Sequence, residues 1–119
     1  MEILEAKLMG ILAEHRGKAN PIGMGELFRK VYGEDYEHRI NDTDKLRGLI
    51  RKIRRRGEVP LCSTDDRRNP GYFLAETAAE LQEFFDWRRG RVLSSLEQIS
   101  HMERHAMAAL KGQAEMEAG

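Results

Sequence analysis

Cysteine is almost absent from this chain of 119 residues, which contains one, Cys62. A single cysteine excludes an intramolecular disulfide and a zinc site built from several cysteines. The sequence also lacks any apolar run of the roughly 20 residues that a membrane-spanning helix needs. Its N-terminus has neither the basic start nor the long apolar stretch of a signal peptide. We therefore expect a cytoplasmic protein that does not contact membranes.

Net charge is absent as well, since 20 lysines and arginines balance 20 aspartates and glutamates. The balance is uneven along the chain. Residues 41–70 carry 9 basic and 5 acidic side chains, whereas residues 71–119 carry 5 and 8, and residues 1–40 carry 6 and 7. A polyanion responds to the local field rather than to the net charge. The overall neutrality therefore does not exclude a nucleic-acid partner.

Common enzyme motifs are missing too. The sequence has no glycine-rich phosphate loop of the Walker type and no nucleophile elbow. His101 and His105 are spaced to share one helix face, but Met102 stands where zinc proteases have glutamate, and a third ligand is lacking. We expect no enzymatic activity, no metal and no cofactor.

What the sequence does contain suits one small globular domain, with 40% hydrophobic and 34% charged residues. Apolar residues at helical spacing predict a first helix from Ile3 to near Gly17 and a second at Met24–Tyr32. Between the two helices, residues 20–23 are expected to form a turn or a very short extended piece.

A third helix, rich in arginine, is expected after a polar loop at residues 33–39. Asn41 or Asp42 can cap its start, and Gly57 closes a basic last turn. Seven of the 14 residues in the range 43–56 are lysine or arginine. The apolar residues of this helix predict a buried stripe that leaves the basic ones outside, namely Leu46, Leu49, Ile50 and Ile53.

Two short strands with a charged turn between them predict a hairpin after the basic helix. The first strand covers Val59–Ser63, where Pro60 favours a place at the edge of a sheet. The second covers Gly71–Ala75, and residues 64–70 form the turn.

A C-terminal helix is expected to start at the capping box formed by Thr77 and Glu80. Gly90 is expected to bend or interrupt this helix, and residues 112–119 are expected to form a frayed tail. Beyond Gly90, apolar residues at steps of three and four predict a stripe that packs against another helix. We expect this stripe to be a dimerisation surface, formed by Val92, Leu96, Ile99, Met102, Ala106 and Leu110.

The order of these elements resembles the winged helix-turn-helix class, especially its small bacterial and phage regulators. The resemblance rests on Gly25–Phe28 in the second helix, Leu46–Gly57 in the third and Val59–Leu74 in the hairpin. It implies an α+β, mainly helical fold, with three helices and a hairpin wing in residues 1–75. Residues 76–111 would then be a helical extension that precedes the tail.

Duplex DNA binding by the basic helix and the wing is what this resemblance implies. Arginine suits the task because its planar fork meets phosphates and guanine edges bidentately. Arg47, Arg51 and Arg54 or Arg55 recur at steps that place them on one helix face. The candidate DNA-binding residues are Thr43, Lys45, Arg47, Arg51, Lys52, Arg54 and Arg55 in the helix, and Arg67 and Arg68 at the tip of the wing.

Two features depart from the simplest form of this class. The connection at residues 33–41 is longer than a tight helix-turn-helix turn, which leaves the docking of the third helix open. Asp65 and Asp66, beside the arginines of the wing, would oppose phosphate unless they are paired.

We therefore expect sequence-specific binding to double-stranded DNA by a homodimer, as in transcription regulation. The alternative is a winged-helix protein-interaction module, such as a phage-type inhibitor or assembly adaptor that acts through the C-terminal helix. A third interpretation is an accessory protein that handles nucleic acid without sequence preference. The three differ in their affinity for DNA and in their sequence preference.

Overall fold

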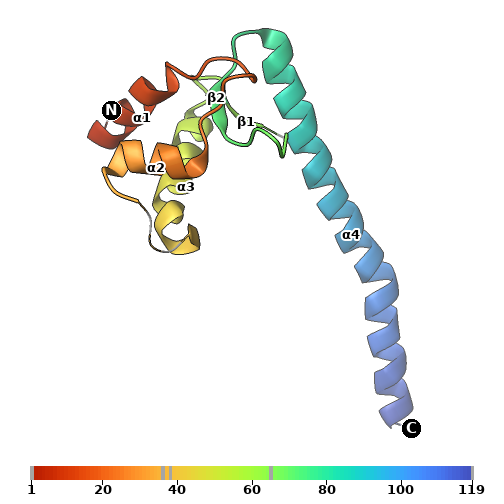
Figure 1. Ribbon diagram of the computed structural model, residues 1–119. Helices are drawn as coiled ribbons and strands as arrows, with labels where there is room; N and C mark the ends of the chain where they lie inside the picture. Colours follow the sequence, from red (N-terminus) through yellow and green to blue (C-terminus); the bar gives the residue numbers. More distant parts are fainter. Residues whose placement is uncertain (1, 36, 38, 65, 119) are drawn as a thin grey trace. The chain divides into compact units, whose positions relative to one another are not determined.

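The computed structural model describes residues 2–35, 37, 39–64 and 66–118, and their side chains except those of 39, 40 and 114–118. The described part is mainly helical with one small antiparallel sheet, which confirms the α+β class (Figure 1). Its elements are α1 (Ile3–Leu12), α2 (Met24–Tyr32), α3 (Arg39–Arg56), β1 (Leu61–Ser63), β2 (Tyr72–Leu74) and α4 (Ala78–Ala118).

The chain divides into two compact units, unit 1 (Met1–Phe84) and unit 2 (Phe85–Gly119). The division falls within α4, nine residues after the domain boundary expected from the sequence. The reason lies in two side chains of the first turns of α4, Leu81 and Phe84, which pack against a buried cluster of unit 1.

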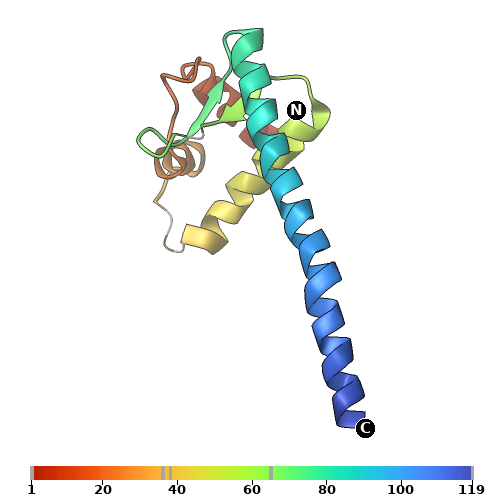
Figure 2. The ribbon, with the colours of Figure 1, turned by 90° about the vertical axis from the view of Figure 1, so that its right-hand side faces the viewer.

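The two faces of the hairpin bury different side chains, as the alternation of a strand requires. Leu61 pairs with Leu74, and both join the main core of unit 1. The hairpin and the helices α1, α2 and α3 of this unit are seen from a second side in Figure 2. Cys62 pairs with Phe73, and these two and Ala75 form the smaller cluster against which Leu81 and Phe84 pack. The main core comprises Leu8, Leu12, Ile22, Leu27, Phe28, Val31, Leu46, Leu49, Ile50, Ile53, Leu61 and Leu74.

The segment between α1 and α2 adds to the free edge of β2. Ile22 and Tyr72 exchange two backbone hydrogen bonds of 2.9 Å each. Gly71 precedes this contact with a φ of +145°, and a Cβ at this position would overlap the carbonyl group of Ile22. Glycine is therefore required here, because the two backbones approach too closely for any side chain. The short extended piece expected between the first two helices is confirmed at Ile22.

Several helix boundaries differ from their predictions. The prediction for α2 is confirmed, including its end at Gly33, which has a φ of 80°. The prediction that the first helix reaches Gly17 is wrong: α1 ends at Leu12. Its continuation bonds to β2 instead, since the Gly17 amide donates to the Leu74 carbonyl at 2.8 Å.

The third and fourth helices are longer than expected. Helix α3 begins at Arg39, ahead of the predicted cap at Asn41 or Asp42. Helix α4 runs without interruption through Gly90, so of the two outcomes predicted there, a bend or an interruption, the interruption is wrong (Figure 1). It continues to Ala118, so the part of the expected tail that the structure describes is helical. Among the described residues, no helix is both long enough and apolar enough to span a membrane.

Candidate nucleic-acid interface

Helix α3 presents three sides besides its buried stripe. Its apolar residues Leu46, Leu49, Ile50 and Ile53 are buried, as predicted. Because successive residues of a helix are rotated by about 100°, its polar residues fall on the three remaining sides. One side faces α1, one faces the hairpin and one points to solvent, so the basic residues of α3 do not have a common role.

A buried carboxylate occupies the side of α3 that faces α1. Glu5 is 0% exposed and accepts hydrogen bonds from Arg56 Nη1 at 2.6 Å and Arg56 Nη2 at 3.0 Å. Lys52 Nζ lies 3.3 Å from Glu5 Oε1 and 3.4 Å from Glu2 Oε1. The hydrogen bonds from Arg56 and then those from Lys52 hold the pKa of Glu5 below its ordinary value. Lys52, a predicted DNA-binding residue, is therefore engaged within unit 1.

The arginine expected near the end of the exposed face points toward the hairpin. Arg54 is half-buried, and its Nε donates to the Leu61 carbonyl at 3.1 Å. Its guanidinium carbon lies 5.1 Å from the ring centre of Phe84 and 5.8 Å from that of Tyr72. Arg54 thus ties α3 to the hairpin and to the start of α4, so its predicted place on the exposed face is wrong.

Thr43 and Arg47 form a contact within α3. Thr43 is 1% exposed, so its side chain is not available to a ligand, which corrects the prediction for this residue. Its Oγ1 accepts a hydrogen bond from Arg47 Nη2 at 2.9 Å. Arg47 is half-buried and lies at the margin of the solvent side.

The solvent side of α3 carries the remaining basic residues. Lys45, Arg51 and Arg55 are exposed, and neither arginine forms an ion pair with the part of the chain that the structure describes. Gly48 lies between them on this side, and a Cβ built there would meet one atom within 4 Å, Arg51 Nη2 at 3.8 Å. We call Gly48, Arg51 and Arg55 the outer face of α3. Asp44 is exposed one turn earlier, so the positive charge lies in the C-terminal half.

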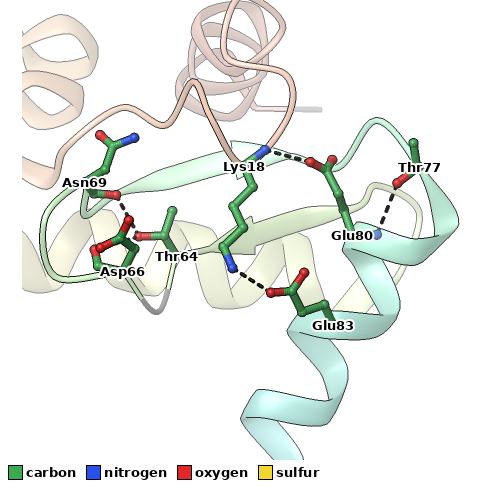
Figure 3. A network of polar contacts seen from close by, with 7 residues as sticks. All are labelled: Lys18, Thr64, Asp66, Asn69, Thr77, Glu80 and Glu83. Carbon is green, nitrogen blue, oxygen red and sulfur yellow. Dashed lines mark hydrogen bonds and ion pairs between the residues drawn. The ribbon is translucent and has the colours of Figure 1, made fainter.

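The tip of the hairpin holds the other two candidate arginines. Arg67 and Arg68 are exposed. Asp66 Oδ1 accepts a hydrogen bond from the Arg68 amide at 2.9 Å. Thr64 Oγ1 donates to the Asn69 carbonyl at 2.9 Å (Figure 3). Asp66 therefore shapes the turn that presents the arginines. The other acidic neighbour, Asp65, lies outside the described residues.

A polar network fixes the start of α4 to the rest of unit 1 (Figure 3). The sequence predicted its capping box at Thr77 and Glu80 but not its contacts with Lys18. The Lys18 amide donates to Glu80 Oε2 at 2.9 Å, and Lys18 Nζ lies 2.6 Å from Glu83 Oε1. The Glu80 amide donates to Thr77 Oγ1 at 3.1 Å, as the predicted capping box requires. The amides of Lys18 and then of Glu76 lower the pKa of Glu80.

The predicted dimerisation residues lie in unit 2 and are exposed: Val92, Leu96, Ile99, Met102, Ala106 and Leu110. The rings of His101 and His105, on the same helix, lie 4.4 Å apart between centres. Among the described residues, no group of three or more histidine, cysteine or acidic side chains is placed to hold a metal ion. Burial raises the pKa of the Cys62 thiol to about 11, so this group is held in its protonated form.

Comparison with known proteins adds no relative. The sequence matches no family model, and no curated protein and no solved structure is significantly similar to the chain.

Proposed function

We propose that this chain binds double-stranded DNA through the outer face of α3 and the arginines at the tip of the hairpin. The observation that supports the proposal is that the basic residues of α3 fall into two groups, one engaged within unit 1 and one facing solvent. Arg54, Arg56 and Lys52 are engaged within unit 1, whereas Arg51 and Arg55 are exposed in the C-terminal half of the helix. A helix that presents guanidinium groups in this way suits the major groove of duplex DNA.

The order of elements in unit 1 also supports this proposal. An extended residue between α1 and α2 bonds to β2, and α3 is followed directly by the β1–β2 hairpin. A winged helix has the same order, with the helix before the hairpin as its recognition element. The exposed Arg67 and Arg68 suit contact with phosphates beside that helix.

Gly48 is a further reason to propose contact at the outer face. Glycine costs a helix about 1 kcal/mol relative to alanine. Packing within unit 1 does not require it, because a Cβ at Gly48 would meet no atom closer than 3.8 Å. A requirement for close approach by an external backbone accounts for a glycine at this half-buried position of the outer face.

The proposal predicts a loss of DNA affinity in the double variant Arg51→Ala, Arg55→Ala. Each phosphate contact contributes roughly one unit to the slope of log affinity against log salt, so the slope should fall by about two. Fluorescence anisotropy with a labelled random duplex at several salt concentrations measures both quantities. The matched control is Arg104→Ala, which removes an exposed arginine of unit 2 and should leave both unchanged.

An unchanged affinity and salt slope in the folded double variant would contradict the proposal. If DNA binding is found, selection of bound sequences from random duplex DNA separates two forms of the proposal. Enrichment of one motif indicates a sequence-specific regulator, and the absence of enrichment indicates an accessory protein without sequence preference. If the wild-type chain has no affinity for DNA, the exposed stripe of unit 2 favours the protein-interaction module.

A further inference from the structure

Unit 2 is a helix with an apolar stripe that nothing in its own unit covers. Val92, Leu96, Ile99 and Leu110 are between 52% and 63% exposed. An isolated helix gains its stability in water mainly from packing an apolar face, so this stripe calls for a partner.

The spacing of the stripe is that of a coiled coil. Starting at Phe85, positions at alternating steps of four and three follow one seam along α4. Six of the eight positions from 85 to 110 are apolar, and the other two are Arg89 and Glu103. Met102 lies beside this seam rather than in it. The seam consists of Phe85, Arg89, Val92, Leu96, Ile99, Glu103, Ala106 and Leu110.

The charges of unit 2 indicate which partner fits the seam. Residues 85–95 carry three arginines and one aspartate and form the basic half of the helix. The seam itself holds two charged residues of opposite sign, Arg89 in this half and Glu103 beyond it. A second copy that runs in the opposite direction brings the arginine of each chain near the glutamate of the other. A parallel copy instead stacks Arg89 on Arg89 and Glu103 on Glu103 within the seam, which like charges disfavour.

We propose that unit 2 pairs with unit 2 of a second copy as an antiparallel coiled coil. The register with the best match has its twofold axis between Leu96 and Ile99, which then face each other. Phe85 faces Leu110, and Val92 faces Glu103. Because Arg89 is three residues from Val92, its side chain starts about 4.5 Å along the axis from the glutamate and can reach it.

The intrahelical contacts of the basic half leave this pairing open. Arg89 Nη1 lies 3.5 Å from Asp86 Oδ1, and both side chains are about two-thirds exposed, at 67% and 65%. An exposed pair of this kind is weak. The Arg91 guanidinium lies 5.4 Å from the ring centre of Trp87 and outside the seam. Where unit 1 binds DNA as proposed above, a twofold dimer also predicts a site with an inverted repeat.

Disulfide trapping in the full chain tests both the pairing and its direction. Chains with Val92→Cys and chains with Glu103→Cys are mixed, equilibrated and oxidised. The antiparallel register predicts a cross-link between the two kinds of chain and none between two Val92→Cys chains, whose thiols lie about 16 Å apart along the axis. Cys62 is buried and does not compete. Ser94→Cys mixed with Glu103→Cys is the matched control, because Ser94 lies on the opposite side of the helix.

Charge exchange provides a second, independent measurement. Arg89→Glu and Glu103→Arg should each raise the dimer dissociation constant at least tenfold in sedimentation equilibrium. The double variant should restore it, because the antiparallel pair is then rebuilt with its signs exchanged. Cross-linking of Val92→Cys chains with themselves, or no restoration in the double variant, overturns the antiparallel proposal.

A wild-type chain that stays monomeric also overturns the proposal and assigns the stripe to a different protein. All of these experiments are done without DNA. Their failure therefore leaves the test with Arg51 and Arg55 intact, and the failure of that test leaves the pairing of unit 2 intact.

Discussion

At the scale of single residues, Glu5 is the most constrained ionisable group of unit 1. It is fully buried on α1 and is satisfied by Arg56 and Lys52 from α3. A buried carboxylate is tolerated when its charge is paired and hydrogen-bonded, and the loss of one partner leaves a costly unpaired charge. The same contact engages two of the basic residues of α3, Arg56 and Lys52, within unit 1.

Glu5 should make the stability of the protein sensitive to acid. Its pKa in the folded protein lies below the ordinary value of 4.5, so its contribution is complete above about pH 4.5 and is lost as the pH falls through the folded pKa. Glu5→Gln should lower the urea midpoint at neutral pH and weaken the decline in acid. Urea titrations between about pH 3 and pH 7 measure this, with the exposed Glu97→Gln as control. An identical pH profile in the Glu5 variant would show that the pairing does not stabilise the fold.

Gly71 should tolerate no side chain, although it is not part of the proposed interface. Gly71→Ala forces an L residue to a φ of +145° and brings a Cβ onto the Ile22 carbonyl group. The expected cost is about 1–3 kcal/mol for the backbone conformation alone. The matched control is Gly10→Ala in α1, where a Cβ meets nothing within 4 Å and helix propensity favours alanine. Thermal unfolding of both variants measures the difference, and equal midpoints would contradict the role given to Gly71.

At the scale of the elements, α3 has one property that the sequence predicts and one that it does not. Its buried stripe could be predicted because helical periodicity is a local property. The roles of its basic residues could not be predicted, because these roles depend on neighbours that are distant in sequence. Arg56 contacts Glu5, 51 positions away, and Arg54 contacts Phe84, 30 positions away. Nothing near these residues in the sequence distinguishes them from Arg51 and Arg55.

The ends of the helices illustrate the same limit. Gly33 ends α2 by a local conformation that glycine favours, so this end could be predicted. Helix α1 ends at Leu12 because the chain after it bonds to β2, which follows some 60 residues later. A single glycine at position 90 does not interrupt α4, because the helix continues on either side of it.

Gly48 provides a test of the outer face of α3 as an element. Gly48→Gln should not destabilise unit 1, since a Cβ there meets one atom within 4 Å, the flexible end of Arg51 at 3.8 Å, and glutamine favours a helix. DNA affinity should nevertheless fall by roughly tenfold, the effect of losing a contact of about 1.4 kcal/mol. Gly10→Gln places the same side chain on an exposed position of α1 and should leave affinity unchanged. Equal affinities in both variants would remove the outer face of α3 from the interface.

At the scale of the whole molecule, the division within α4 predicts which fragment is stable. A chain that ends at residue 84 retains both clusters of unit 1 and should unfold cooperatively as a monomer. A chain that ends at residue 75, the boundary expected from the sequence, loses Leu81 and Phe84. At about 1 kcal/mol or more for each half-buried side chain, it should be less stable by at least about 2 kcal/mol. Urea unfolding of the two fragments measures this, and equal stabilities would place the boundary back at residue 75.

The continuous α4 has a consequence for how this protein responds to its own abundance. Unit 2 exposes its apolar stripe within a single chain. If it pairs with a second copy as proposed, its order depends on that pairing and thus, by mass action, on protein concentration. Unit 1 carries its own core, so its order does not depend on protein concentration. Dilution should therefore melt the helix of unit 2 while unit 1 stays folded. A cell that makes few copies would hold independent unit 1 domains, and one that makes many would hold them joined in pairs.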